Sequence, residues 1–212
     1  ASHFAPGIAL PVELVTQSLA LPEDTPARAP GRALRRLLDL GLLEGTPDAP
    51  VLHRLLAAFV QQAAPDNGAQ AVVERVMIDT TSELNEQGIP AQVLALQPHL
   101  RHITAAALVR GDEHAATLAN NLASHLQDVG DYAAARPLYE RALAIREQVL
   151  GRDHPDTAGS LNNLAALHKD TGDYAAARPL YERALAIHEQ VLGRTHPDTA
   201  LSLNNLAGLL RA

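Results

Sequence analysis

The sequence predicts a mainly α-helical protein, in which a repeated pair of helices follows a smaller segment that contains helices and one β-hairpin. Three observations lead to this fold class. The phrase GDYAAARPLYERALAI stands at residues 130–145 and again at residues 172–187. The 42-residue stretches 117–158 and 159–200 are identical at 32 positions, and the chain ends in the beginning of a third copy. Residues 1–66 lack the repeat and contain short apolar segments separated by Gly and Pro.

Each copy is expected to fold as two amphipathic helices, because its apolar residues recur three and four positions apart. In the second copy, the stripe of the first helix consists of Leu161, Leu164, Ala165 and His168. The stripe of the second helix consists of Tyr174, Ala177, Leu180, Tyr181, Ala184, Leu185, Ile187 and Val191. Between them, Gly172 can adopt a positive φ and Asp173 can cap the second helix.

The link between copies reads GRDHPDT and then GRTHPDT. We predict that Asp153 and Thr195 are the N-caps of the helices that follow, with Asp156 and Asp198 completing capping boxes. Histidines also stand in or near such links, and we expect them to have a structural role in the turn between copies. These histidines are His114, His154 and His196.

The segment LNNLAALHKDTGDYAAARPLYERALAI resembles a tetratricopeptide repeat of the 42-residue type found in kinesin light chains and many bacterial signalling proteins. The resemblance covers residues 117–212 and implies two full repeats and a terminal helix in a right-handed superhelix. One helical hairpin cannot bury its own apolar face, so the copies are expected to stack and share a core. Residues 67–116 are expected to form a divergent helix pair or degenerate first repeat, broken near Gly88–Pro90. The residues at the family's packing positions are Leu161, Leu164, Ala165, Gly172, Tyr174, Ala177, Tyr181 and Ala184.

Residues 1–66 are predicted to contain a short helix in LPVELVTQSLAL, a helix in GRALRRLLDLGLL, a hairpin that turns at Thr46–Asp48, and a closing helix in RLLAAFVQQ. This order is that of a winged-helix domain. The segment resembles the winged helix that follows the nucleotide-binding module in signalling NTPases of the STAND class, also called NB-ARC type. That class includes relatives of apoptosome proteins and plant disease-resistance proteins.

In that family a Met-His-Asp triplet opens the last helix of the winged domain, and its His reaches the β-phosphate of bound ADP. The matching residues are Leu52, His53 and Arg54, so the His is kept while Arg replaces the acid. The resemblance implies that His53 senses ADP or ATP in a parent protein; the alternative is a His that ends a strand. The chain begins at Ala1, and we expect it to be a piece of a longer polypeptide with an upstream NTPase module.

Composition narrows the function classes. The net charge of −7 is a poor match for nucleic acid or anionic lipid. The absence of cysteine excludes disulfides and thiolate chemistry, and is typical of the cytoplasm, where we expect the protein. No HExxH, GxSxG or GxxxxGK[ST] motif is present, so we expect no enzyme activity and no cofactor in this chain.

His99 and His102 share a helical spacing without a third ligand, and we expect a solvated face rather than a metal site.

Pairs of asparagine recur in the middle of each first helix, where Asn is a poor helix former. By resemblance to kinesin light chains, these carboxamides and the polar residues one or two turns further on are expected to bind the backbone of an extended peptide on the concave face. The alternative is that one Asn of each pair bonds the neighbouring repeat. The candidate peptide-binding residues are Asn120, Asn121, Gln127, Asp128, Asn162, Asn163, Lys169, Asp170, Asn204 and Asn205.

The favoured function is a non-catalytic sensor and relay segment of a STAND-type protein, which captures a protein or peptide and transmits its occupancy. Two alternatives stay open. A purely structural scaffold would have no ligand. A winged-helix transcription regulator would use a basic cluster near the second helix, although the hairpin segment EGTPDAP is acidic. The residues of that cluster, which could equally contact a neighbouring domain, are Arg28, Arg32, Arg35 and Arg36.

Overall fold

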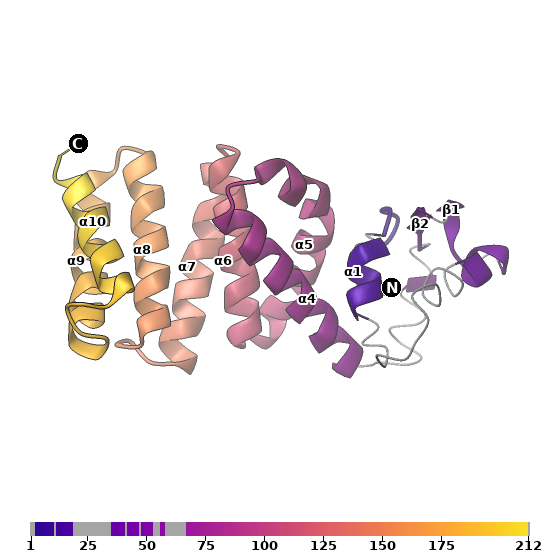
Figure 1. The fold of residues 1–212 in the computed structure, drawn as a ribbon, viewed down its shortest axis with the longest axis horizontal. Helices are drawn as coiled ribbons and strands as arrows, with labels where there is room; N and C mark the ends of the chain where they lie inside the picture. The colour runs from indigo at the N-terminus through magenta and orange to yellow at the C-terminus, as the bar shows by residue number, and fades with distance from the viewer. Residues whose placement is uncertain are drawn as a thin grey trace. The chain divides into compact units, whose positions relative to one another are not determined.

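A computed structural model describes residues 3–10, 12–18, 35–40, 42–46, 48–52, 56–57 and 67–211. The chain divides into two compact units at Ala106 and Ala107. The first unit contains α1 (Val12–Ser18), β1 (Glu44–Thr46), β2 (Ala49–Val51) and α4 (Asn67–Glu86), and α5 (Pro90–Arg110) begins in it. The second contains α6 (Glu113–Asp128), α7 (Tyr132–Val149), α8 (Pro155–Asp170), α9 (Tyr174–Val191) and α10 (Pro197–Leu209) (Figure 1).

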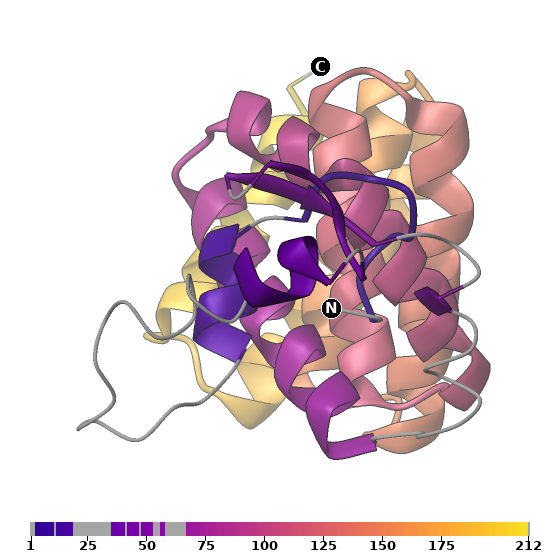
Figure 2. The same cartoon turned by 90° about the vertical axis from the view of Figure 1, so that its right-hand side faces the viewer.

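The predicted hairpin is present in the first unit. Strands β1 and β2 pair antiparallel, with Thr46 opposite Ala49 at the turn (Figure 2). Gly45 has φ +88°, and a Cβ on it would stand 2.5 Å from the carbonyl oxygen of Ala49. Only glycine fits this position without a local shift, because the left-handed conformation and the nearby carbonyl both exclude a side chain.

The N-terminal segment adds to this hairpin, which the sequence did not predict. Ala9 forms a bridge with Val51, and the Leu10 amide donates to the Pro50 carbonyl at 2.7 Å. Pro50 has no N–H of its own, but its carbonyl is free to accept. The hairpin, α1 and a helical turn at 35–39 agree with the predicted elements, whereas the winged-helix assignment as a whole stays a prediction.

His99 corrects the expectation of a solvated histidine face. It is buried on α5, where its Nδ1 accepts from the Ala5 amide at 3.0 Å and its Nε2 donates to the Ala9 carbonyl at 2.7 Å. The edge of the Phe4 ring packs on it, with ring centroids 5.6 Å apart. Both ring nitrogens are engaged by backbone, so His99 orders the N-terminal segment, while His102 is half-buried. Burial lowers the pKa of both histidines.

The break predicted near Gly88–Pro90 is confirmed, because α4 ends at Glu86 and α5 begins at Pro90. In the second unit the two helices of each copy also lie where the periodicity places them, and they pack side by side in chain order (Figure 1). The turns use Gly130 and Gly172 at φ +82° and +78°.

The N-caps of the second helices are as predicted, but those of the first helices lie one residue further on. Asp173 accepts from the Ala176 amide at 3.2 Å, as expected. In the links, however, His154 and His196 are the N-caps, and each accepts at Nδ1 from the amide two residues on at 3.2 Å. The assignment to Asp153 and Thr195 was therefore wrong, because Pro occupies N1 and shifts the cap to the residue before it.

Neighbouring helices of the array share two buried apolar clusters. In α9, the residues Ala184 and Ile187 pack against Ala158 and Leu161 of α8. A second cluster joins α8 and α9 to α10 and consists of Ala165, Ala177, Tyr181 and Leu209. Leu209 belongs to the third copy, so the stacking that the repeat predicted is confirmed. Tyr174 and Val191, at the two ends of α9, are exposed and do not join the predicted stripe.

Candidate functional site

The first helices of the two full copies, α6 and α8, are joined by a carboxamide pair. The Asn163 side chain donates from Nδ2 to Oδ1 of Asn120 at 2.8 Å. Both side chains are half-buried, so each keeps part of its surface in contact with solvent. This pair lies midway along the helices, where the sequence placed the peptide-binding asparagines.

The other member of each pair lies inside the protein. Asn121 and Asn162 are each only 6% exposed. Asn162 donates from Nδ2 to the Ser202 hydroxyl of α10 at 2.7 Å, which joins the second copy to the third. For Asn162 the alternative of a structural bond to the neighbouring copy is therefore the one observed, and neither residue is displayed to a peptide. Of the third pair, Asn204 is exposed and Asn205 is half-buried.

A second polar bridge stands at the C-terminal ends of the same helices. The Tyr139 hydroxyl on α7 donates to Gln127 Oε1 at 3.0 Å, and Gln127 Nε2 donates to Asp170 Oδ2 at 2.6 Å. Burial raises the pKa of the Tyr139 hydroxyl, which stays a neutral donor. Asp128 and Asp170 are exposed, and Lys169 is half-buried.

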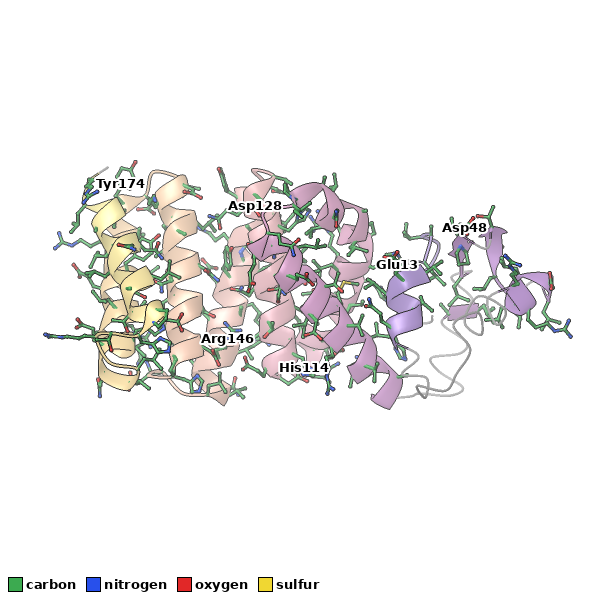
Figure 3. The ribbon with its side chains drawn as sticks, in the orientation of Figure 1. Glu13, Asp48, His114, Asp128, Arg146 and Tyr174 are labelled. Carbon is green, nitrogen blue, oxygen red and sulfur yellow. The ribbon has the colours of Figure 1, made fainter. Side chains whose placement is uncertain are left out.

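The carboxylates at the C-terminal ends of α6 and α8 disfavour the approach of further negative charge. Partial burial raises the pKa of Asp128, and the neighbouring Asp170 carboxylate raises it too, while His125 acts in the opposite direction. Asp128 and His114 mark the two ends of α6 (Figure 3). A ligand group that donates hydrogen bonds or carries positive charge therefore suits the Asp128 end of the helix.

We define the first-helix face as the predicted peptide-binding residues that keep some exposure. They contribute carboxamide, carboxylate and ammonium groups from α6, α8 and α10. The residues of the first-helix face are Asn120, Gln127, Asp128, Asn163, Lys169, Asp170, Asn204 and Asn205.

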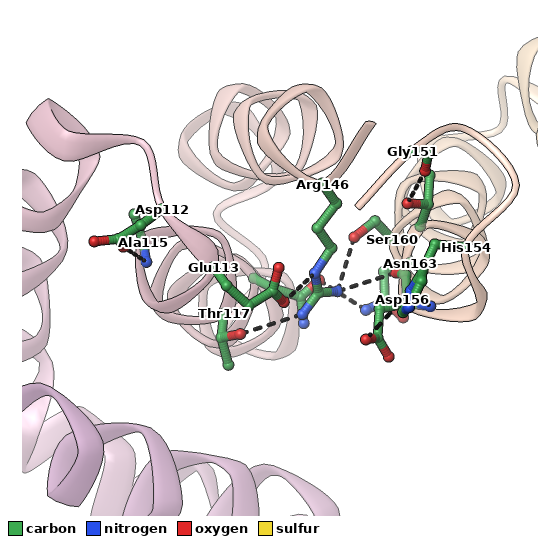
Figure 4. Close-up of polar contacts among 12 residues, drawn as sticks. Asp112, Glu113, Ala115, Thr117, Arg146, Gly151, His154, Asp156, Ser160 and Asn163 are labelled. Atoms are coloured by element: carbon green, nitrogen blue, oxygen red, sulfur yellow. Dashed lines mark hydrogen bonds and ion pairs between the residues drawn. The ribbon is translucent and has the colours of Figure 1, made fainter. Parts of the chain in front are cut away.

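Arg146 links three helices and was missed by the sequence analysis. From α7 it donates through Nε to Glu113 at 3.3 Å and through Nη2 to the Thr117 hydroxyl at 3.2 Å, both on α6 (Figure 4). Its Nη1 donates to the Ser160 hydroxyl at 2.9 Å and to the Asp156 carbonyl at 3.2 Å, both on α8. The guanidinium fork suits this role because it offers five donors in a fixed plane.

His188 takes the place of Arg146 in the next copy. Its Nε2 donates to the Pro155 carbonyl at 3.2 Å, and its Nδ1 lies 2.8 Å from the Ser202 hydroxyl that also accepts from Asn162. The change from Arg to His is one of the few differences between the copies, and it was the signal that could have located this junction. In both copies the residue fastens one repeat to the next.

His114 lies in the first turn of α6, whose N-cap is Asp112, whereas His154 and His196 have the structural role expected of them. Arg35 and Arg36 are exposed on the helical turn at 35–39. The residues that lie outside the described part of the chain are Arg28, Arg32, His53 and Arg54.

No group of three or more His, Asp or Glu side chains within the described residues is placed to hold a metal ion. None of the helices in the described part of the chain is both long enough and apolar enough to cross a membrane.

The polar groups of the first-helix face are carboxamides, carboxylates and one ammonium. Their chemistry suits hydrogen bonding to a polypeptide backbone.

Comparison with known proteins agrees with the fold of the second unit. The family model of the tetratricopeptide repeat matches residues 114–190 and 156–212. A search of curated proteins found no significant match.

Solved structures are similar in fold. BtubC (BKLC) from P. vanneervenii superposes with a TM-score of 0.50 at 18% identity, over 93% of this chain and 66% of that chain. A putative kinesin light chain from Podosopora anserina with nearly identical TPR-like repeats superposes with a TM-score of 0.51 at 20% identity, over 95% of this chain and 87% of that one. Residues 114–212 therefore form an array of tetratricopeptide repeats, a family whose members typically act as scaffolds for protein–protein interaction.

Proposed function

We propose that this chain is a non-catalytic protein-binding segment whose first-helix face binds an extended stretch of a partner polypeptide. The observation that carries this proposal is the pairing of Asn163 with Asn120 and of Gln127 with Asp170 across α6 and α8. These bonds hold the side chains in fixed positions while leaving them partly accessible. A peptide backbone that approaches them meets donors and acceptors that are already ordered, which reduces the entropy lost on binding.

The size of the polar contribution sets the affinity. The five carboxamides of the first-helix face, at about 0.5 to 1.5 kcal/mol each, contribute roughly 2.5 to 7.5 kcal/mol. Association itself costs about 4 to 15 kcal/mol. A backbone-only ligand would therefore bind weakly, and we expect useful affinity only from peptides that add side-chain contacts. A basic residue near Asp128 and Asp170 is the contact that the charges of this face favour.

The finer proposal is that the segment relays ligand occupancy to a STAND-type NTPase module upstream in a longer polypeptide. The helix α1, the helical turn at 35–39 and the hairpin support it, because they come in the order of the first elements of the winged helix in that class, while most of the predicted closing helix lies outside the described residues. In such a protein, ligand binding must favour the open arrangement over the closed one, because a ligand with equal affinity for both shifts nothing. His53 is the residue proposed to contact ADP there.

The binding proposal is tested with peptides selected from a displayed random library against the chain. Replacing Asn120, Asn163 and Asn205 by Ala should weaken the selected peptides about tenfold or more, because backbone bonds are lost. The matched control replaces Gln148 and Gln190, which are exposed carboxamides on the second helices. Helical circular dichroism should be unchanged in both, and the melting temperature of the Asn variant should fall by only a few degrees, because it loses the bond between Asn163 and Asn120. Equal affinity of the two variants for the peptides would refute the first-helix face.

The relay proposal has a separate test. The genomic reading frame upstream of Ala1 should encode a phosphate-binding loop of the form GxxxxGK[ST], followed by an ATPase module. A reading frame without that loop would remove the STAND assignment and leave the protein-binding proposal intact.

A further inference from the structure

The segment of residues 3–10, which we call the strap, is fastened to α5 by the buried ring of His99. The Ala5 amide donates to His99 Nδ1 at 3.0 Å, and His99 Nε2 donates to the Ala9 carbonyl at 2.7 Å. The ring is only 1% exposed. One imidazole therefore holds the strap at two points, at one nitrogen as an acceptor and at the other as a donor.

The strap also contacts β2 and buries apolar side chains. The Gly7 amide donates to the Leu52 carbonyl at 2.9 Å, and the Leu10 amide donates to the Pro50 carbonyl at 2.7 Å. The side chains of Phe4 and Leu10 are buried. A short segment that is held by a few such contacts can open while the helices of its unit stay folded.

Only the neutral ring of His99 fits this arrangement. A neutral imidazole has one donor and one acceptor nitrogen, whereas a protonated imidazole has two donors. A proton on Nδ1 would face the N–H of Ala5 across 3.0 Å, and two donors form no hydrogen bond. Burial lowers the pKa of His99, while its bond to the Ala9 carbonyl acts in the opposite direction. The charged ring is therefore favoured once it is released into water.

The surroundings of His99 do not compensate a positive charge. Neither α5 nor the strap contains an acidic residue; their other histidines are His102, whose charge opposes protonation of His99, and His3. Elsewhere in the unit, the buried Glu74 of α4 accepts from a glutamine of its own helix, and Glu13 of α1 is exposed. The arginines of α5 and the remaining charged residues of α4 and β1 are exposed as well. A protonated His99 thus has no carboxylate to pair with on the strap or on α5.

We propose that the strap is a pH-sensitive latch, which is docked while His99 is neutral and which leaves α5 and β2, with the helices intact, when His99 binds a proton. Release uncovers the surface under the Phe4 ring and the carbonyls of Pro50 and Leu52 along β2. The inference concerns the first unit and does not depend on the peptide-binding role of the first-helix face.

Native-state hydrogen exchange in low concentrations of urea tests whether the strap opens by itself. The amides of Ala5 and Gly7 report on release of the strap. The amides of Met77 on α4 and Ile103 on α5, at buried helical positions, report on unfolding of the unit. The strap amides should exchange faster and depend less on urea, because release exposes less surface than unfolding does. Equal protection and equal urea dependence of the two sets would overturn the proposal, because the strap would then leave only when the unit unfolds.

The same measurement at several pH values tests the latch. The protection of the Ala5 amide, corrected for the intrinsic effect of pH on exchange, should be greatest above pH 6.5 and should decrease as pH falls toward the lowered pKa of the docked ring. The decrease should approach about tenfold per pH unit, because the released ring binds one proton more than the docked ring does. Protection of Ala5 that does not change with pH would overturn the proposal.

Variants identify the titrating group. His99→Gln should remove the pH dependence of strap release, because glutamine does not titrate. His102→Gln and His3→Gln are the matched controls on α5 and on the strap, and both should retain it. A pH dependence that survives in His99→Gln, or that disappears in His3→Gln, would overturn the proposal. Helical circular dichroism checks the fold of each variant, and the exchange measurements on the unaltered chain are decisive without them.

Discussion

Asn162 on α8 and Ser202 on α10 are joined by a hydrogen bond of 2.7 Å between Nδ2 and the hydroxyl. Both side chains are buried. The bond crosses from one copy of the repeat to the next, and the same hydroxyl lies 2.8 Å from His188 Nδ1. One polar chain of three residues thus fixes the position of the third copy against the second.

Asn162→Asp should destabilise the protein strongly. The substitution removes the donor to Ser202 and buries a carboxylate, at a cost of about 3 kcal/mol. The matched control is Asn204→Asp, the same position one repeat later, where the side chain is exposed and a change within about 0.5 kcal/mol is expected. Urea unfolding followed by circular dichroism measures both, and equal destabilisation by the two variants would show that burial of Asn162 is not what matters.

Arg146→Ala should loosen the junction between the first two copies. It removes donors to α6 and α8 from a side chain that is only 12% exposed, and we expect a loss of about 2 kcal/mol. Arg146→His should retain part of the lost stability, because His188, at the same position one repeat later, hydrogen-bonds the neighbouring helices at the following junction. Arg194→Ala is the control, since its pair with Glu189 lies at the surface. Equal melting temperatures for Arg146→Ala and Arg194→Ala would contradict the proposed role of Arg146 at this junction.

Gly45→Ala should open the hairpin of the first unit. The added Cβ meets the Ala49 carbonyl, and the left-handed φ alone costs an L-residue roughly 1 to 2 kcal/mol. Gly88 also has a positive φ, at +65°, but no atom lies within 4 Å of the position that a Cβ would take. Gly88→Ala should therefore cost only the free energy of the left-handed conformation. Hydrogen exchange of the Leu10 amide, which bonds to Pro50, reports on the hairpin. Its protection should fall in Gly45→Ala and persist in Gly88→Ala; the reverse order would refute the steric argument.

The stability of the first unit should decrease in mild acid through His99. Burial lowers the pKa of His99 below its ordinary value of 6.5, so the unfolded chain binds the proton first. Stability is therefore full above pH 6.5 and declines as pH falls below it toward the folded pKa. His99→Gln should flatten the dependence of the urea midpoint on pH, and His102→Gln should flatten it less because His102 is half-buried.

An NMR titration provides the independent check on this pH dependence. The His99 ring protons of the folded protein should titrate below the ordinary histidine pKa of 6.5. A His99 that titrates at or above that value would contradict the burial argument.

Sequence reasoning located the elements well wherever the signal was local. The two copies, their helices, the glycine turns and the hairpin all follow from periodicity and from residues with special backbone preferences. The predicted caps at Asp153 and Thr195 were wrong by one residue. His is a rare N-cap, and the Pro after it was the better guide to where the helix begins.

The site was predicted less completely. The asparagine pairs marked the correct part of the first helices, but the sequence could not say which member of each pair is buried. Asn121 and Asn162 occupy different positions within the repeat, and yet both are buried. The environment of each depends on which residues the neighbouring helices present, and these differ between copies at positions such as Arg146 and His188.

The sequence by itself determined that residues 117–212 would stack as helix pairs, because a hairpin with apolar residues on one stripe is stable only when another covers it. Tertiary structure alone decided what each polar side chain does. His99 became a buried anchor for the N-terminal segment, and Arg146 became a link between three helices. The reason is physical: periodicity records which face of a helix is apolar, whereas hydrogen bonds and exposure depend on residues brought together from distant parts of the chain.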